Sequence, residues 1–202
     1  MGDKQNGPVA PFADDKKAPM VSPLARVEKQ FILKAVYWIP AWLETYHLTA
    51  MTILWSGGMI GFGFLARGNL TWLWGSSLML FLQWLTDCFD GAVGRHRQTG
   101  LIKWGFYMDH LLDFIFMWCV FVGYVYLLPA EKVWHVYVVA FLYSGLMVNA
   151  FLDFAATNEF RITYFGIGPT EIRILFICLN TVVITWGVGV LEMIIPYLAG
   201  FL

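Results

Sequence analysis

The stretch from residue 86 to residue 113 decides the fold, and it reads TDCFDGAVGRHRQTGLIKWGFYMDHLLD. It places four aspartates at the facing ends of two long apolar runs: Asp87, Asp90, Asp109 and Asp113. Within each pair the spacing is three or four residues, which puts two side chains on one face of a helix. If the two runs form neighbouring antiparallel helices, all four carboxylates converge on one pocket at the membrane edge.

Carboxylates crowded in low-dielectric surroundings repel one another, and they stay ionised only beside a cation. Hard divalent cations prefer oxygen ligands, so magnesium, manganese or calcium suits such a site. Two ions could share four carboxylates and clamp a phosphate. The alternative is that the acids are helix caps or solvated charges of a loop. Two same-face pairs around a Gly-Ala-x-Gly-Arg turn favour the metal site, which we predict to hold two magnesium or manganese ions.

The composition indicates a membrane protein. Of the 202 residues, 59% are hydrophobic and only 13% are charged, whereas a soluble domain carries roughly 25% charged residues. The mean hydropathy is +0.63. We therefore predict an all-α polytopic membrane helix bundle rather than a soluble domain.

The chain divides into three predicted parts. Residues 1–22 are expected to form a mobile tail, residues 23–40 an interfacial amphipathic helix, and residues 41–202 a transmembrane catalytic bundle. The bundle has five clear spans, at about 48–66, 70–90, 106–128, 133–154 and 171–187, with loops at 93–103 and 157–168. A sixth, shorter span is expected over residues 188–202, although Pro196 leaves a loop there as the alternative. Glycines in the first span predict close helix contacts: Gly57, Gly58, Gly61 and Gly63.

The distribution of basic residues predicts the orientation of the bundle. Of the 13 Lys and Arg residues, all but Arg67 and Lys132 fall in the tail, the amphipathic segment, the 93–103 loop or the 157–173 region. Because cytoplasmic loops carry the excess of Lys and Arg, the aspartates should face the cytoplasm. We expect a bacterial inner-membrane protein whose site soluble nucleotides can reach.

The aspartate stretch resembles the signature of the CDP-alcohol phosphotransferases, also called CDP-alcohol phosphatidyltransferases. That signature is D-x-x-D-G-x-x-A-R, eight or nine residues, then G-x-x-x-D-x-x-x-D, and only Gly94 departs from it, standing in place of alanine. The resemblance implies a phospholipid-synthesising transferase that moves a substituted phosphate from a CDP-linked donor to an alcohol and releases CMP. It also implies a homodimer, and no nucleic-acid partner is expected.

The resemblance also implies roles for individual residues. Asp87, Asp90, Asp109 and Asp113 would be metal ligands, and Asp113 is in addition a candidate base for the acceptor hydroxyl. The glycines of the motif, Gly91, Gly94 and Gly105, would leave room for the nucleotide, with helix packing as the alternative explanation. Arg95 would contact the nucleotide phosphates, since a guanidinium offers a fork of donors.

A second resemblance points to the choline and ethanolamine phosphotransferase branch. His110 directly follows the third aspartate, and the run YFGIGPTE over residues 164–171 leads into the last clear span. In that branch a His and a Glu at these places activate the lipid hydroxyl, which would make His110 and Glu171 a catalytic dyad. The alternatives are that Glu171 caps its helix and that His110 only partners an aspartate.

Four readings of the function follow. The leading hypothesis is a soluble donor such as CDP-ethanolamine or CDP-choline with an acceptor such as diacylglycerol. The alternative is a CDP-diacylglycerol donor with a small polar alcohol as the acceptor. An acceptor that carries a phosphate often needs basic residues to bind it, and beyond Arg95 only Arg161 and Arg173 are candidates. A divalent-cation transporter is a hypothesis of another class, and it would place its acids near the bilayer midplane. An Asp-rich prenyl transferase would carry duplicated Asp motifs, which this sequence lacks.

Overall fold

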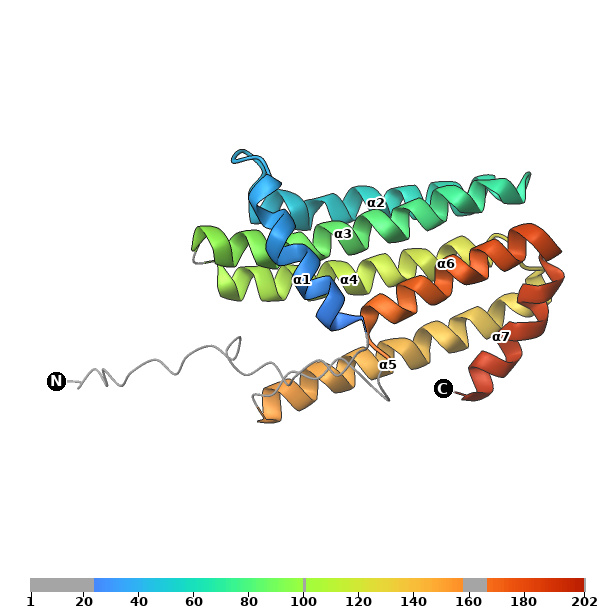
Figure 1. The fold of residues 1–202 in the computed structure, drawn as a ribbon. Coiled ribbons are helices and arrows are strands. Elements are labelled where there is room, and N and C mark those ends of the chain that lie inside the picture. Colours follow the sequence, from blue (N-terminus) through green and yellow to red (C-terminus); the bar gives the residue numbers. More distant parts are fainter. Residues whose placement is uncertain (1–23, 100, 158–166, 202) are drawn as a thin grey trace.

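The computed structural model describes residues 24–99, 101–157 and 167–201, and the regular structure in these ranges is helical apart from an isolated bridge at Ile167 (Figure 1). The α-helices, in chain order, are α1 Ala25–Ala35, α2 Thr45–Leu65, α3 Leu73–Arg97, α4 Ile102–Val125, α5 Val133–Thr157, α6 Pro169–Trp186 and α7 Gly189–Phe201. Three short 3-10 helices adjoin the α-helices: η2 Val36–Trp38 follows α1, η3 Leu70–Trp72 precedes α3 and η4 Ala130–Lys132 precedes α5. The all-α prediction is confirmed.

Four helical segments in the described ranges are long and apolar enough to cross a membrane: Thr45–Leu65, Lys103–Val125, Ala130–Thr157 and Pro169–Trp186. They indicate an integral membrane protein. Helix α3 has the length, with 25 residues, but polar side chains such as Gln83 and the two aspartates lower its apolar content. Helix α7 has 13 residues with Pro196 inside it, fewer than the roughly 20 that a span needs. A bundle of five or six spans therefore stays a prediction.

The segment predicted as the loop 93–103 is largely helical, so that prediction is wrong in its extent. Helix α3 continues through the Gly-Ala-x-Gly-Arg motif to Arg97 and ends at Gln98, whose φ of 52° lies in the left-handed region. Each glycine disfavours a helix by about 1 kcal/mol. Between them, however, Ala92 and Val93 are buried in a small core with Leu48 of α2. Tertiary packing thus extends the helix past a sequence that reads as a turn.

Arg97 fixes this end of the bundle. Its guanidinium donates to the backbone carbonyls of Leu43 at 2.8 Å, Pro40 at 2.9 Å and Ile39 at 3.2 Å. It also pairs with Glu44 at 3.4 Å, at the start of α2. The last turn of α3 is therefore tied to the segment that leads from α1 into α2.

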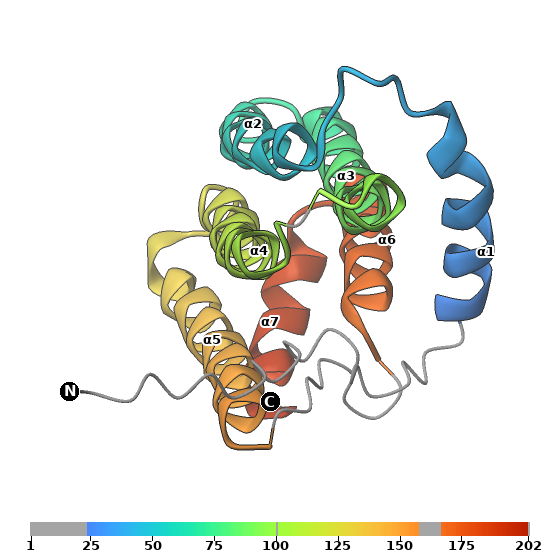
Figure 2. The same cartoon turned by 90° about the vertical axis from the view of Figure 1, so that its left-hand side faces the viewer.

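Helix α2 packs against both α3 and α4, α6 packs on α3, and α5 contacts α4 and α7 (Figures 1 and 2). The crossing of α2 and α4 is very close: a Cβ on Gly63 would lie 2.5 Å from the Cα of Gly123. Gly58 likewise faces Met79, whereas a Cβ on Gly57 or Gly61 would meet nothing within 4 Å. The predicted close contacts are confirmed for Gly58 and Gly63, whereas Gly57 and Gly61 make none with the residues that the structure describes.

Helix α1 lies at the side of the bundle, next to α3 and α6 (Figure 2). The carboxylate of Glu28 accepts a hydrogen bond from Trp84 Nε1 at 3.1 Å and from Thr170 Oγ1 at 2.7 Å. Two predicted apolar-face residues, Val27 and Phe31, remain exposed, which supports contact with a membrane surface. The interfacial position itself stays a prediction, and the predicted tail lies outside the described residues.

Candidate active site

Three of the four predicted aspartates form a cluster. Asp87 and Asp90 of α3 and Asp109 of α4 each offer a carboxylate oxygen, and these oxygens all lie within 4.8 Å of one another. Asp90 is buried, and the other two are half-buried. Helices α3 and α4 run antiparallel (Figure 1), and this arrangement brings the oxygens together. Hard oxygen ligands at this spacing fit a divalent cation such as magnesium or manganese.

Asp113 lies one turn beyond Asp109 on α4 and has different partners. Gln83 Nε2 donates to Asp113 Oδ1 at 2.6 Å. Arg173 of α6 pairs with both Asp113 Oδ1 at 3.3 Å and Asp87 Oδ2 at 2.9 Å. The side chain of Arg173 is buried, with an exposed fraction of 6% for the residue. The structure thus places Asp113 beside the cluster and links it to Asp87 through a guanidinium.

Asp90 is held by α2. Thr49 Oγ1 donates to Asp90 Oδ2 at 2.9 Å, one of the few polar contacts between α2 and the aspartates. A turn earlier on α2, Thr45 Oγ1 is buried with no hydrogen-bond partner in the described part of the chain. A Cβ on Gly94 would lie 3.1 Å from that hydroxyl oxygen. The helix α2 therefore supports one wall of the site through threonine hydroxyls.

The other predicted nucleotide-binding residues lie around the cluster on α3 and α4. Arg95 is exposed, and a Cβ on Gly91 would be 3.3 Å from its Nη1 atom. Glycine at 91 thus allows the guanidinium to lie close to the helix backbone. A Cβ on Gly105 would meet no described atom within 4 Å. Protein packing therefore gives no reason for glycine at position 105.

His110 and Glu171 have distinct local partners. His110 Nδ1 lies 2.7 Å from the carbonyl oxygen of Phe106, and because a carbonyl only accepts, Nδ1 carries the proton. The same nitrogen is 3.7 Å from Asp109 Oδ2. Glu171 Oε2 accepts the backbone N–H of Gly168 at 2.9 Å, so Glu171 caps α6. Capping agrees with one alternative for Glu171, and the catalytic dyad stays a prediction.

Three residues of the site were not predicted as contacts from the sequence: Gln83, Thr49 and, as an aspartate partner, Arg173. Gln83 is fully buried. A glutamine in an apolar run, four residues before the first aspartate and so on its helix face, is the signal that could have found it. The contact of Arg173 joins residues 86 positions apart, which no local pattern reveals. Arg161 and residues 164–166 lie outside the described residues.

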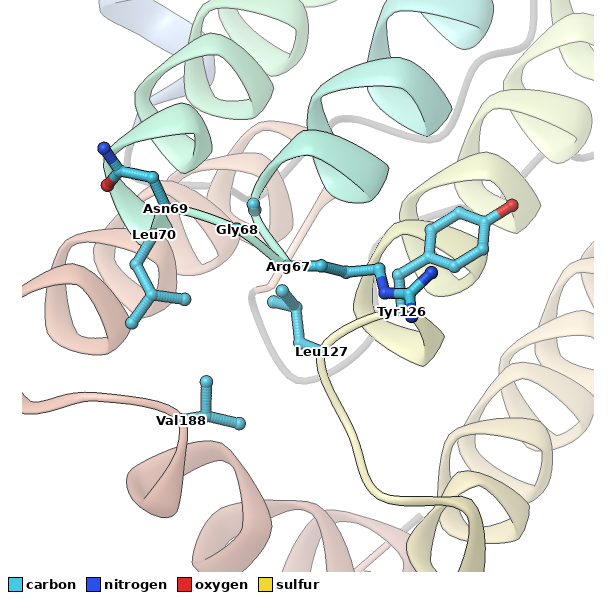
Figure 3. Close-up of a pocket in the computed structure, with 8 residues that line it drawn as sticks. Arg67, Gly68, Asn69, Leu70, Tyr126, Leu127 and Val188 are labelled. Carbon is cyan, nitrogen blue, oxygen red and sulfur yellow. The ribbon is translucent and has the colours of Figure 1, made fainter.

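A surface pocket (Figure 3) lies among the helix connections at the end of the bundle opposite the aspartates. Its volume is about 280 Å³, and residues from the α2–α3, α4–α5 and α6–α7 connections line it, among them Arg67, Asn69, Tyr126 and Val188. Helix α3 starts at this end and carries its aspartates near its other end. The residues that line this pocket include no carboxylate, whereas the group of described carboxylates that could hold a metal ion lies at the aspartate end.

Comparison with known proteins identifies one family. The model of the CDP-alcohol phosphatidyltransferase family matches residues 38–202. No curated protein and no solved structure gives a significant match. Members of the matched family are transferases of substituted phosphate groups, act in phospholipid synthesis and use divalent metals. The match does not favour a divalent-cation transporter.

Proposed function

The chain belongs to the CDP-alcohol phosphatidyltransferase family, and from this premise we propose that it transfers a substituted phosphate from a soluble CDP-amino-alcohol to a lipid alcohol, with release of CMP. The donor would be CDP-ethanolamine, CDP-choline or a close analogue, and the acceptor a diacylglycerol. The observation that carries the proposal is the cluster of three carboxylates from two helices. His110, beside the third of them, supports the amino-alcohol branch.

Asp87, Asp90 and Asp109 would hold the divalent cations, magnesium or manganese, with Asp113 completing the set for a second ion. When bound, such ions neutralise the donor pyrophosphate and make its phosphorus a better electrophile. The donor set supports this fit, because its oxygens are of the hard type and lie within 4.8 Å of one another. Arg95, exposed at the end of α3, would bind the phosphates of the nucleotide.

The proton of the acceptor hydroxyl needs a base. In our proposal it moves to His110 Nε2 while the hydroxyl oxygen attacks the donor phosphorus and the bond to CMP breaks. The hydrogen bond from Nδ1 to the Phe106 carbonyl supports this role, because it leaves the lone pair of a neutral imidazole on Nε2. Glu171 would orient the ring or raise its basicity. Asp113 is the alternative base.

The choice of donor rests on the available cations. A phosphorylated polar acceptor, used with a CDP-diacylglycerol donor, needs a basic side chain free to bind its phosphate. Arg173 is buried and ion-paired with two aspartates of the motif, so its guanidinium serves the metal and donor site rather than the phosphate of an acceptor. This supports the soluble donor, with phosphatidyl transfer from CDP-diacylglycerol as the second candidate.

We further propose that the aspartate end faces the cytoplasm of a bacterial inner membrane, as the distribution of Lys and Arg predicts.

A homodimer is proposed as well. Its support is that Gly57 and Gly61, four residues apart on α2, are exposed and would allow a second helix to approach closely. Crosslinking in native membranes would test the dimer, and a monomer at all protein concentrations would contradict it.

The test is CMP release by the purified protein with magnesium or manganese. CDP-ethanolamine and CDP-choline with diacylglycerol are compared with CDP-diacylglycerol and a panel of polar alcohols. We expect release with the soluble donors. Release only with the lipid donor would contradict the proposed donor and return the base to Asp113. If the soluble donors give CMP release, the turnover of His110→Gln and Glu171→Gln is measured next. Unchanged turnover in Glu171→Gln would mean that Glu171 acts as a helix cap and not in catalysis.

A further inference from the structure

One nitrogen atom of Arg173 joins the two halves of the aspartate motif. Its Nη2 lies 2.9 Å from Asp87 Oδ2 and 3.3 Å from Asp113 Oδ1. A divalent ion shared by these carboxylates would lie in the same kind of position, in contact with one oxygen of each. The guanidinium and such an ion carry like charge and need the same oxygens. They therefore exclude each other there.

The other side of the motif is not blocked in this way. Among the described residues, the cluster of Asp87, Asp90 and Asp109 meets Arg173 only through Asp87. Asp90 is held by the neutral hydroxyl of Thr49 at 2.9 Å. Arg173 contacts Asp87 at Oδ2, so a first divalent ion at the cluster would use Asp87 Oδ1 together with Asp90 and Asp109 and leave Arg173 in place. The four carboxylates therefore divide into the cluster of Asp87, Asp90 and Asp109 and a second position, between Asp87 and Asp113, that Arg173 occupies.

Gln83 contributes a buried amide to the position between Asp87 and Asp113 that Arg173 occupies. It is fully buried, and its Nε2 donates to the same Asp113 oxygen that Arg173 contacts, at 2.6 Å. The Oε1 atom of the same amide has no hydrogen-bond partner in the described part of the chain. Buried polar atoms are normally paired, and amide oxygens are ligands for hard cations and their bound water.

We propose that Arg173 competes with the second divalent ion for Asp87 and Asp113, so that the two ions bind in order. The first binds at Asp87, Asp90 and Asp109, and the second binds only after Arg173 has moved. The inference rests on the proposed function, because the pyrophosphate of the donor is the anion that draws the guanidinium away. The CDP moiety supplies that pyrophosphate whatever alcohol the donor carries. Arg173 is thus a positioning residue that couples donor binding to the second ion.

Manganese binding by the wild-type protein tests the order without turnover. Electron paramagnetic resonance of the purified protein in detergent counts bound Mn²⁺ ions with and without CDP. We expect one tightly bound ion per chain without CDP. With CDP we expect a second ion and the line broadening of two neighbouring ions. Two ions of equal affinity without CDP would overturn the proposal. Failure of CDP to bind at all would instead count against the proposed function, and the variants below would still decide the competition.

Arg173→Gln removes the competing charge. We expect this variant to bind the second Mn²⁺ without CDP, with an affinity on the order of tenfold higher than that of the wild type. Arg173→Lys keeps the charge and should restore the one-ion behaviour. The matched control is Gln83→Met, which removes a donor to Asp113 but leaves Arg173 in place, and it should bind one ion without CDP. A second-ion affinity in Arg173→Gln equal to or below that of the wild type would overturn the proposal. If circular dichroism shows that Arg173→Gln does not fold, the wild-type measurement decides.

Discussion

Gly94 stands where the family signature has alanine, and a neighbouring side chain supplies a local reason. A Cβ at this position would lie 3.1 Å from Thr45 Oγ1, closer than ordinary van der Waals contact. The threonine is buried at the start of α2. Position 94 and position 45 are therefore coupled: the hydroxyl on one helix takes the space that the methyl group would need on the other.

A double-mutant cycle measures this coupling. Gly94→Ala alone should change the free energy of unfolding little. The close contact of the new methyl group with Thr45 Oγ1 offsets the higher helix propensity of alanine. In the Thr45→Ala background the same change should stabilise the protein by about 0.5–1 kcal/mol. Thermal unfolding of the four proteins in one detergent gives the values. Equal effects of Gly94→Ala in both backgrounds would show that the two positions are independent.

Gly105 presents the opposite case, since no described atom lies within 4 Å of the Cβ that it lacks. We predict that Gly105→Ala leaves the unfolding temperature unchanged or slightly higher, because alanine favours the helix by about 1 kcal/mol. At the same time it should raise the KM for the CDP donor on the order of tenfold, because the methyl group enters space used by the nucleotide. Gly145→Ala is the control, since its Cβ would also meet nothing within 4 Å and it lies on α5, outside the motif. Equal KM values for the two variants would refute the role of Gly105.

At the scale of the helices, the crossing of α2 and α4 depends on Gly63 and Gly123. The backbone of Gly123 lies where a Cβ on Gly63 would be, with its Cα at 2.5 Å. We predict that Gly63→Ala destabilises the protein by about 1–3 kcal/mol, because overpacking forces the helices apart. The exposed Gly145→Ala serves as the reference for the helix propensity of alanine. A Gly63→Ala protein as stable as Gly145→Ala would contradict the close crossing.

Helix α1 is attached through Glu28, which accepts hydrogen bonds from Trp84 of α3 and Thr170 of α6. We predict that Glu28→Ala releases α1 and increases amide hydrogen exchange in residues 25–35 roughly tenfold, which corresponds to about 1.4 kcal/mol. Glu28→Gln keeps one acceptor oxygen and should have a smaller effect. The control is Glu131→Gln, an exposed acid in η4. Protection of α1 that is unchanged in Glu28→Ala would mean that other contacts hold the helix.

The helices themselves could be predicted from hydrophobic runs, and the structure differs mainly at their ends. The prediction placed a loop from residue 93, because two glycines and an arginine resemble a turn, yet α3 continues to Arg97. What extends it is the burial of Val93 against other helices and the hydrogen bonds of Arg97 to carbonyls more than 50 positions earlier. Local sequence contains neither partner.

For the whole molecule, the sequence predicted the end of the bundle at which the four aspartates gather. It did not predict that three of them cluster while Asp113 has separate partners. The spacing of three residues puts Asp87 and Asp90 on one helix face, and the antiparallel return of the chain predicts that Asp109 joins them. The attachment of Asp113 to Gln83 and Arg173 depends on where α6 packs, and α6 follows the motif by more than 50 residues. Long-range packing of this kind leaves no local periodicity to detect.

The central claim is that this cluster binds the divalent ion on which transfer depends. The most direct measurement is CMP release from the CDP donor by purified wild type, Asp109→Asn and the control Glu131→Gln, each with saturating manganese and with a chelator. We predict release by wild type and Glu131→Gln only with manganese. For Asp109→Asn we predict a rate lower by at least about a hundredfold, since it lacks one ligand carboxylate, with folding intact by circular dichroism. Release that survives chelation, or a folded Asp109→Asn protein with the wild-type rate, would contradict the account.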